Sequence, residues 1–111
     1  MNLKNLHSVF FLGIGGIGMS AIARWFNHIG VPVYGYDKTP SPLTEALSQE
    51  GMTIVYTDEI ESLPDSFKTA GENKLIVWTP AVPQNSELYK FFNNNGFAIQ
   101  KRAAVLGLIT K

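Results

Sequence analysis

Cysteine is absent from the 111-residue sequence, and neither sign of charge is in excess. A chain without cysteine has no disulfide framework, no cysteine-ligated zinc site and no catalytic thiol. Nine lysine and arginine residues balance nine acidic residues, so the net charge is zero. Because nucleic-acid binding requires a basic face that displaces counterions from phosphates, we expect no nucleic-acid partner. The two histidines, His7 and His28, are not spaced as a metal-binding pair, and we expect no metal site.

The sequence also lacks an uninterrupted apolar segment long enough to cross a membrane. After Lys4, the stretch from Leu6 to Ala23 carries no charge, and its last three residues resemble a signal-peptidase site. A membrane span needs about 20 mostly apolar residues, whereas this stretch contains four glycines, a histidine and two serines. The glycines lie between a strand-like and a helix-like run, an order that a cleavable leader does not need. We therefore expect neither a leader nor a membrane segment.

Acidic residues are concentrated between Glu45 and Glu72, where Lys68 is the one basic residue. They are scattered through loop-forming sequence, and spaced acids in loops need no partner. We therefore expect a solvated acidic surface there, without a function of its own.

Short apolar runs alternate with helix-like segments along the chain. The run from Ser8 to Leu12 is bounded by glycine and is typical of a buried parallel strand. Further strands are expected at residues 31–36, 53–56, 74–78 and 97–100. Helices are expected to begin near Ile17, at Pro42 after the N-cap Ser41, near Ser86 and at Arg102.

This order of elements predicts an α/β fold. Alternating strands and helices form parallel sheets covered on both faces, and right-handed crossovers restrict the topology. We expect a Rossmann-like, doubly wound parallel sheet of about five strands with helices on both faces. The segment from Asp58 to Asn73 contains Pro64 and Gly71, and is expected to hold either a short helix near 59–63 or mostly loop.

The glycines between the first strand and the first helix point to phosphate binding. Gly13, Gly15 and Gly18 form a G-x-G-x-x-G pattern, whose glycines serve a tight turn, close approach of a pyrophosphate and close packing of helix on strand. The start of the following helix offers unpaired N–H groups and a positive dipole end. Asp37 ends the second strand, where a ribose-binding acid belongs. The pattern predicts a site for a diphosphate-linked nucleotide and leaves NAD, FAD and a nucleotide sugar open.

Four stretches of the sequence resemble the Mur ligase family. The first is the glycine loop with its following helix, in which Gly15 and Gly16 form a double glycine. The other three are 33–37 with 40–44, 77–82 with 85–88, and 101–106. They occur in the family's order, cover nearly the whole chain, and are most similar to the branch of the family that adds L-alanine to UDP-N-acetylmuramate. Phe10 and Ala104 depart from the family's pattern, where a histidine and an acid are usual, and 58–73 is longer than typical.

The resemblance implies a ligase reaction for the full-length protein and substrate binding for this chain. In the family, ATP phosphorylates the muramate carboxylate, and the amine of L-alanine attacks the acyl phosphate. The P-loop pattern G-x-x-x-x-G-K-[ST] that serves ATP is missing here. We therefore expect residues 1–111 to be a single UDP-sugar-binding N-terminal domain that ends before the ATPase domain. Such a domain would be cytoplasmic and inactive alone, while ATP, magnesium and L-alanine bind elsewhere in the full-length enzyme.

The resemblance also implies which residues hold the substrate. Backbone N–H groups of Gly15, Gly16, Ile17 and Gly18 are expected to bind the diphosphate, with Met19 behind them and Gly13 forming the turn. Asp37 is expected to contact the ribose or uracil, while Thr79 and Ala81 border the uridine. Arg102 is expected to pair with phosphate or to face solvent.

Two other functions remain open at this stage. A regulatory NAD-binding Rossmann module would use the same glycine loop and would place Asp37 on the adenosine ribose. Such a module does not need the Gly15-Gly16 pair or the Thr79-Pro80-Ala81-Val82 stretch. The ligase that recycles UDP-N-acetylmuramate with murein tripeptide is a nearer alternative, but its glycine loop differs.

Overall fold

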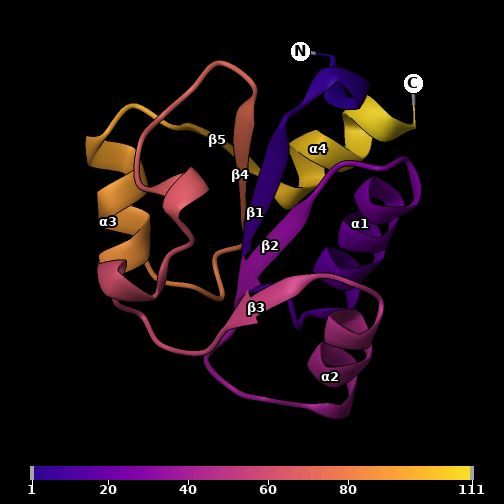
Figure 1. The fold of residues 1–111 in the computed structure, drawn as a ribbon, viewed down its shortest axis with the longest axis horizontal. Helices are drawn as coiled ribbons and strands as arrows, with labels where there is room; N and C mark the ends of the chain where they lie inside the picture. The colour runs from indigo at the N-terminus through magenta and orange to yellow at the C-terminus, as the bar shows by residue number, and fades with distance from the viewer. Residues whose placement is uncertain (1, 111) are drawn as a thin grey trace.

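A five-stranded, all-parallel sheet organises the chain in the computed structural model, which describes residues 2–110 (Figure 1). The strands are β1 (Ser8–Leu12), β2 (Val33–Tyr36), β3 (Thr53–Val55), β4 (Lys74–Trp78) and β5 (Ala98–Lys101). The helices are α1 (Ile17–His28), α2 (Pro42–Gln49), α3 (Glu87–Asn94) and α4 (Arg102–Ile109). The strand order is β3-β2-β1-β4-β5, so the chain moves outward from β1 in both directions. The expected Rossmann-like fold is confirmed.

The two faces of the sheet carry different layers. Helices α1, α2 and α4 cover one face, and α3 covers the other together with two 3₁₀ turns, Ile60–Ser62 and Asp65–Phe67 (Figure 1). Because side chains alternate along a strand, Val9 and Phe11 pack in the core under the first layer, while Phe10 and Leu12 pack in the second core. All five β1 residues are buried, which explains the continuous apolar run in the sequence.

The uncharged N-terminal stretch divides between β1, the glycine loop and the start of α1. Within residues 2–110, no helix combines the length and the apolar character that crossing a membrane would require.

The segment after β3 fills the face that α3 leaves uncovered. Sequence analysis left a short helix or a loop open, and the structure has the two 3₁₀ turns there. Phe67 in the second turn is fully buried, with its ring centroid 5.4 Å from those of both Phe10 and Tyr34. Phe92 and Phe97 extend this aromatic cluster from the α3 side. The turns therefore do the packing that a crossover helix would otherwise provide.

Three acids of the expected solvated surface have partners, and the expectation was wrong for Asp58, which is half-buried. The Asp58 carboxylate accepts hydrogen bonds from the Ser86 hydroxyl (2.8 Å) and from the backbone N–H groups of Glu87 and Leu88 (both 3.0 Å). It thus satisfies orphan donors at the start of α3. Glu50, at the end of α2, pairs with Arg24 of α1 at 2.8 Å, and this hydrogen bond lowers the pKa of the Glu50 carboxyl. Apart from Asp58, the acids of the segment are exposed, as expected: Glu45, Glu50, Glu59, Glu61, Asp65 and Glu72. Asp65 also forms an exposed ion pair with Lys68 at 3.5 Å.

The cap on α3 gives a stability prediction. Replacing Asp58 with Ala removes the acceptor for three donors, so we expect the free energy of unfolding to fall by about 1–3 kcal/mol. Chemical denaturation of both proteins measures this loss. The matched control is Glu59→Ala, since Glu59 is exposed and should change stability by less than about 0.5 kcal/mol. Equal stabilities of the two variants would contradict the capping role.

Candidate functional site

The loop between β1 and α1 is locked onto the neighbouring strand. The N–H groups of Gly13 and Ile14 both donate to the carbonyl oxygen of Tyr36, at 2.9 and 3.0 Å. The Ile14 side chain fills the space beside Gly35, where a Cβ atom would lie 2.6 Å from the Ile14 Cδ1. Gly13 has a φ of +95°, which favours glycine, and a Cβ atom there would come within 2.6 Å of the Thr79 Cγ2. The loop is therefore rigidly placed between the ends of β2 and β4.

The start of α1 presents unpaired amides at the carboxyl edge of the sheet. The first hydrogen bond of the helix runs from the Ser20 N–H to the carbonyl of Gly16, at 2.8 Å. Among residues 2–110, the N–H groups of Ile17, Gly18 and Met19 find no acceptor, and Gly16 supplies no side-chain cap. Three free donors at the positive end of a helix dipole form an environment that stabilises an anion such as a phosphate.

Asp37, immediately after β2, holds the glycine loop. Its Oδ2 accepts the Gly15 N–H at 2.8 Å, and its Oδ1 accepts the Thr39 N–H at 3.0 Å. A Cβ atom on Gly15 would lie 2.6 Å from this same Oδ2, so the contact itself requires glycine. Each carboxylate oxygen keeps a second lone pair, and Asp37 therefore remains able to accept a bond from a ligand hydroxyl.

Nearly all the predicted site residues line one cavity of about 560 Å³. The cavity is lined by Gly13, Gly15, Gly16, Gly18, Met19, Asp37, Thr79, Ala81 and Arg102, all predicted from the sequence, and by Lys38 and Val82. Ile17 does not line it and is 86% exposed, and its N–H is free at the start of α1. The topology thus brings together residues from four separate parts of the chain.

The structure adds two lining residues and gives Gly18 a different neighbour. Lys38 follows Asp37 in the chain and adds a cation to the lining. Val82 ends a turn that the Trp78 indole fixes by donating to the Val82 carbonyl at 2.7 Å. Gly18 was expected to allow close packing of helix on strand, but the atoms nearest to its Cβ position belong to Arg102, with Nη1 at 3.1 Å. The missing side chain makes room for the guanidinium.

A second hollow of about 360 Å³ shares Lys38, Ala81 and Val82 with this cavity. It adds Tyr36 and Asp58 to the lining. Burial raises the pKa of the Tyr36 phenol, and the negative charges of Asp58 and Asp37 raise it further. A neutral hydroxyl and a carboxylate suit a ligand's hydrogen-bonding groups more than its phosphates. The crevice therefore has one end, at α1, that favours an anion and another end, at Tyr36, that offers uncharged and carboxylate hydrogen-bonding groups.

No cluster of three or more metal-ligating side chains forms within the described part of the chain, residues 2–110.

Comparison with known proteins identifies the family. A model described as "Mur ligase family, catalytic domain" matches residues 8–111. A UDP-N-acetylmuramate–L-alanine ligase of Cytophaga hutchinsonii is 50% identical over 111 residues, which are 100% of this chain and 24% of that protein. A ligase of the same name from Flavobacterium johnsoniae is 49% identical with the same coverage. This chain thus spans about a quarter of the length of these relatives.

A solved structure shares the fold. The crystal structure of a UDP-N-acetylmuramate-alanine ligase from Thermotoga maritima superimposes with a TM-score of 0.78 and 27% identity, covering 89% of this chain and 21% of that one. The family model covers nearly all of the sequence, and the relatives are similar to it over its whole length. The chain therefore belongs to the Mur ligase family.

Proposed function

We propose that this chain is the UDP-sugar-binding domain of an ATP-dependent ligase that joins L-alanine to UDP-N-acetylmuramate in peptidoglycan synthesis. Relatives bearing that ligase name are 50% and 49% identical to it over 111 residues. They also favour this activity over the murein-tripeptide recycling ligase and over a regulatory NAD-binding module. The precursor is a water-soluble nucleotide sugar, which fits a cytoplasmic site of action.

The proposed binding position of the diphosphate rests on one observation. The free amides of Gly18 and Met19 belong to residues that line the cavity, as Lys38 and Arg102 do, and the free amide of Ile17 lies between the lining residues Gly16 and Gly18 in the chain. Dipole, amides and two cations all favour negative charge at the same place. Gly15 and Gly16 shape this site, because their own amides bond to Asp37 and to the Gly13 carbonyl. The diphosphate of the UDP-sugar therefore binds in front of α1.

The remaining residues suit the uridine. Asp37 retains lone pairs for a ribose hydroxyl or a uracil N–H, and Thr79 and Ala81 border the crevice beyond it. The hollow with Tyr36 and Asp58 continues the crevice on this side. A nucleoside placed there would have its phosphates directed toward α1.

Within the ligase reaction, this chain contributes binding rather than bond making. Holding the nucleotide end of the substrate fixes the position of its distant carboxylate, and such remote binding energy lowers the barrier of the reaction. The cavity residues do not fit ATP with magnesium, because the sequence lacks a P-loop and residues 2–110 form no cluster of metal ligands. We propose that ATP, magnesium and L-alanine bind parts of the ligase outside this domain.

An amide NMR titration tests the function directly. We expect UDP-N-acetylmuramate to shift the resonances of residues 15–19 and of Asp37, because all of these except Ile17 line the cavity and the Ile17 amide is free at the start of α1. NAD, titrated separately, should leave them unchanged. Shifts with NAD alone would identify a dinucleotide-binding module and overturn the proposal.

The substitution Gly16→Ala, which adds one methyl group, tests where the diphosphate binds. A Cβ atom on Gly16 would have no neighbour closer than 3.7 Å, so Gly16→Ala should leave stability unchanged. The methyl group would occupy space that the anion must enter, and we expect UDP-N-acetylmuramate to bind at least tenfold more weakly, about 1.4 kcal/mol, by calorimetry.

Gly71→Ala is the matched control, because Gly71 lies away from the cavity and its added Cβ would have no neighbour closer than 3.5 Å. Gly15→Ala should instead lower stability by colliding with Asp37. Unchanged affinity in Gly16→Ala would place the diphosphate elsewhere.

The Asp37 carboxylate, which holds the glycine loop, should also strengthen the binding of UDP-N-acetylmuramate. Asp37→Ala removes the acceptors of the Gly15 and Thr39 amides, and we expect binding to weaken by about 1–3 kcal/mol. Asp37→Asn keeps one acceptor oxygen and should lose less. Asp65→Ala is the control, since that side chain is fully exposed. No loss in Asp37→Ala by calorimetry would exclude this residue from the site.

A further inference from the structure

Trp78 is the last residue of β4 and comes directly before a turn at the cavity of the candidate site. Its side chain is 7% exposed and belongs to the core under α3, where its ring packs against Tyr89 with centroids 5.0 Å apart. Trp78 lines neither the cavity of about 560 Å³ nor the hollow of about 360 Å³. A large buried ring of this kind is a fixed point on which the following residues can be positioned.

The turn formed by residues 79–82 is tied to this ring. Pro80 occupies its second position, where a fixed φ favours a turn, and the Val82 N–H donates to the Thr79 carbonyl at 3.0 Å. The Trp78 indole N–H donates to the Val82 carbonyl at 2.7 Å, and this bond is buried. Because a buried N–H without an acceptor destabilises the fold, the ring favours the closed form of the turn.

The turn forms one wall of the cavity. Thr79, Ala81 and Val82 all line the cavity, and Ala81 and Val82 also line the neighbouring hollow. The Cγ2 atoms of Thr79 and Val82 lie 2.6 and 3.4 Å from the Cβ position of Gly13, so the turn rests against the glycine loop. Pro80 and Ala81 are exposed and add little packing. The hydrogen bond to the indole is therefore a main constraint on the position of this wall.

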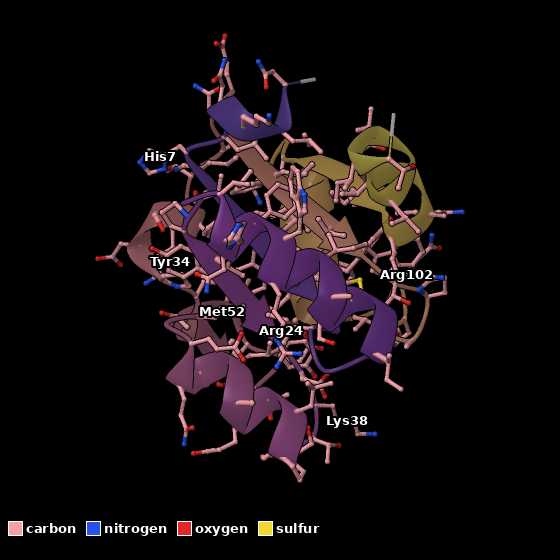
Figure 2. All side chains as sticks on the ribbon, turned by 90° about the vertical axis from the view of Figure 1, so that its right-hand side faces the viewer. His7, Arg24, Tyr34, Lys38, Met52 and Arg102 are labelled. Carbon is pink, nitrogen blue, oxygen red and sulfur yellow. The ribbon has the colours of Figure 1, made fainter. Side chains whose placement is uncertain are left out.

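The same ring lies beside the strand that leads to Arg102. Trp78 is paired with Lys101 in the parallel register of β4 and β5, and the Lys101 Nζ lies over the ring, 5.9 Å from its centroid. An ammonium group in this position is attracted to the face of the ring. Arg102, the next residue, lines the cavity and lies beside α1 (Figure 2). Trp78 thus contacts both segments that enter the cavity from β4 and β5.

We propose that Trp78 is a positioning residue for the nucleotide site, and that its indole N–H holds the 79–82 turn in the form that binds the UDP-sugar. The inference rests on the proposed function. When the turn opens, only the closed fraction of the protein binds, and the apparent affinity falls in proportion to that fraction. Trp78 acts through the turn and is not itself in contact with the substrate.

Removal of the N–H alone tests the proposal. Trp78 is replaced by its benzothiophene analogue, in which sulfur takes the place of the indole N–H and the shape of the ring is kept. We expect calorimetry to show UDP-N-acetylmuramate binding weakened by a factor of about five or more, because the turn loses this donor. The amide resonances of Ala81 and Val82 should shift in the free protein, and saturating UDP-N-acetylmuramate should return them toward their positions in the unaltered chain.

Pro80→Gly loosens the same turn without altering the ring. Pro80 is exposed and does not line the cavity, so the substitution keeps the fold and increases the freedom of the turn. We expect this variant also to bind UDP-N-acetylmuramate more weakly, by a factor of about three or more, with the same resonances shifted. It tests the role of the turn even where the analogue lowers the stability of the protein.

Phe97→Leu is the matched control for lost core packing. Phe97 is 6% exposed in the same core as Trp78, and it precedes β5, at the opposite edge of the parallel sheet from the turn. We expect Phe97→Leu to lower the melting temperature but to leave the affinity and the resonances of Ala81 and Val82 unchanged.

Four outcomes would overturn the proposal. Binding by the analogue as tight as that of the unaltered chain shows that the indole N–H does not position the site, while the proposed function stands. Unchanged binding by Pro80→Gly shows that the form of the turn does not govern affinity. Equal weakening in Phe97→Leu shows that affinity follows general stability. No binding of UDP-N-acetylmuramate to the unaltered chain removes the proposed function on which the inference rests.

Discussion

The hydrogen bond from the Gly15 amide to the Asp37 carboxylate, at 2.8 Å, is the contact on which the site depends. It joins the loop after β1 to the residue after β2, and the Gly13 and Ile14 amides reinforce it through the Tyr36 carbonyl. With the loop fixed in this way, α1 begins at a defined point and leaves three amides unpaired at its N-terminus. An anion site built from backbone dipoles requires this rigidity, because its donors must be in place before the ligand arrives.

The two faces of the sheet are covered in different ways. The face with α3 is closed by an aromatic cluster around Phe67, and Asp58 ties the preceding segment to the start of α3. The face with α1 and α4 is closed over its core but leaves an apolar groove between the two helices. The crevice lies where these faces meet, at the carboxyl edge between β1 and β4, since the chain turns outward there in both directions. Both faces therefore carry a packed core, and the crevice lies at the edge of the sheet between them.

Much of the fold could be predicted because its signals are local. The first and fourth strands have the predicted limits, Ser8–Leu12 and Lys74–Trp78, since both are buried apolar runs between polar or glycine residues. The Ser41 cap of α2 was also predictable, because the side chain and its partner Thr44 are three residues apart. The segment after β3 was harder to predict. Its 3₁₀ turns carry no helical periodicity, and only the burial of Phe67 shows that they belong to the core.

The sequence by itself determined the order of strands and helices, the glycine loop between β1 and α1, and the position of Asp37 after β2, because each depends on residues close together in the chain. Only the tertiary structure decided what those residues touch. The Gly15–Asp37 bond spans 22 positions, the bonds from Asp58 to the start of α3 span 28 to 30, and Arg102 at the start of α4 meets Gly18 of α1 on the same face of the sheet. Such pairings follow from how parallel strands bring distant chain segments to one edge, and no local pattern records them.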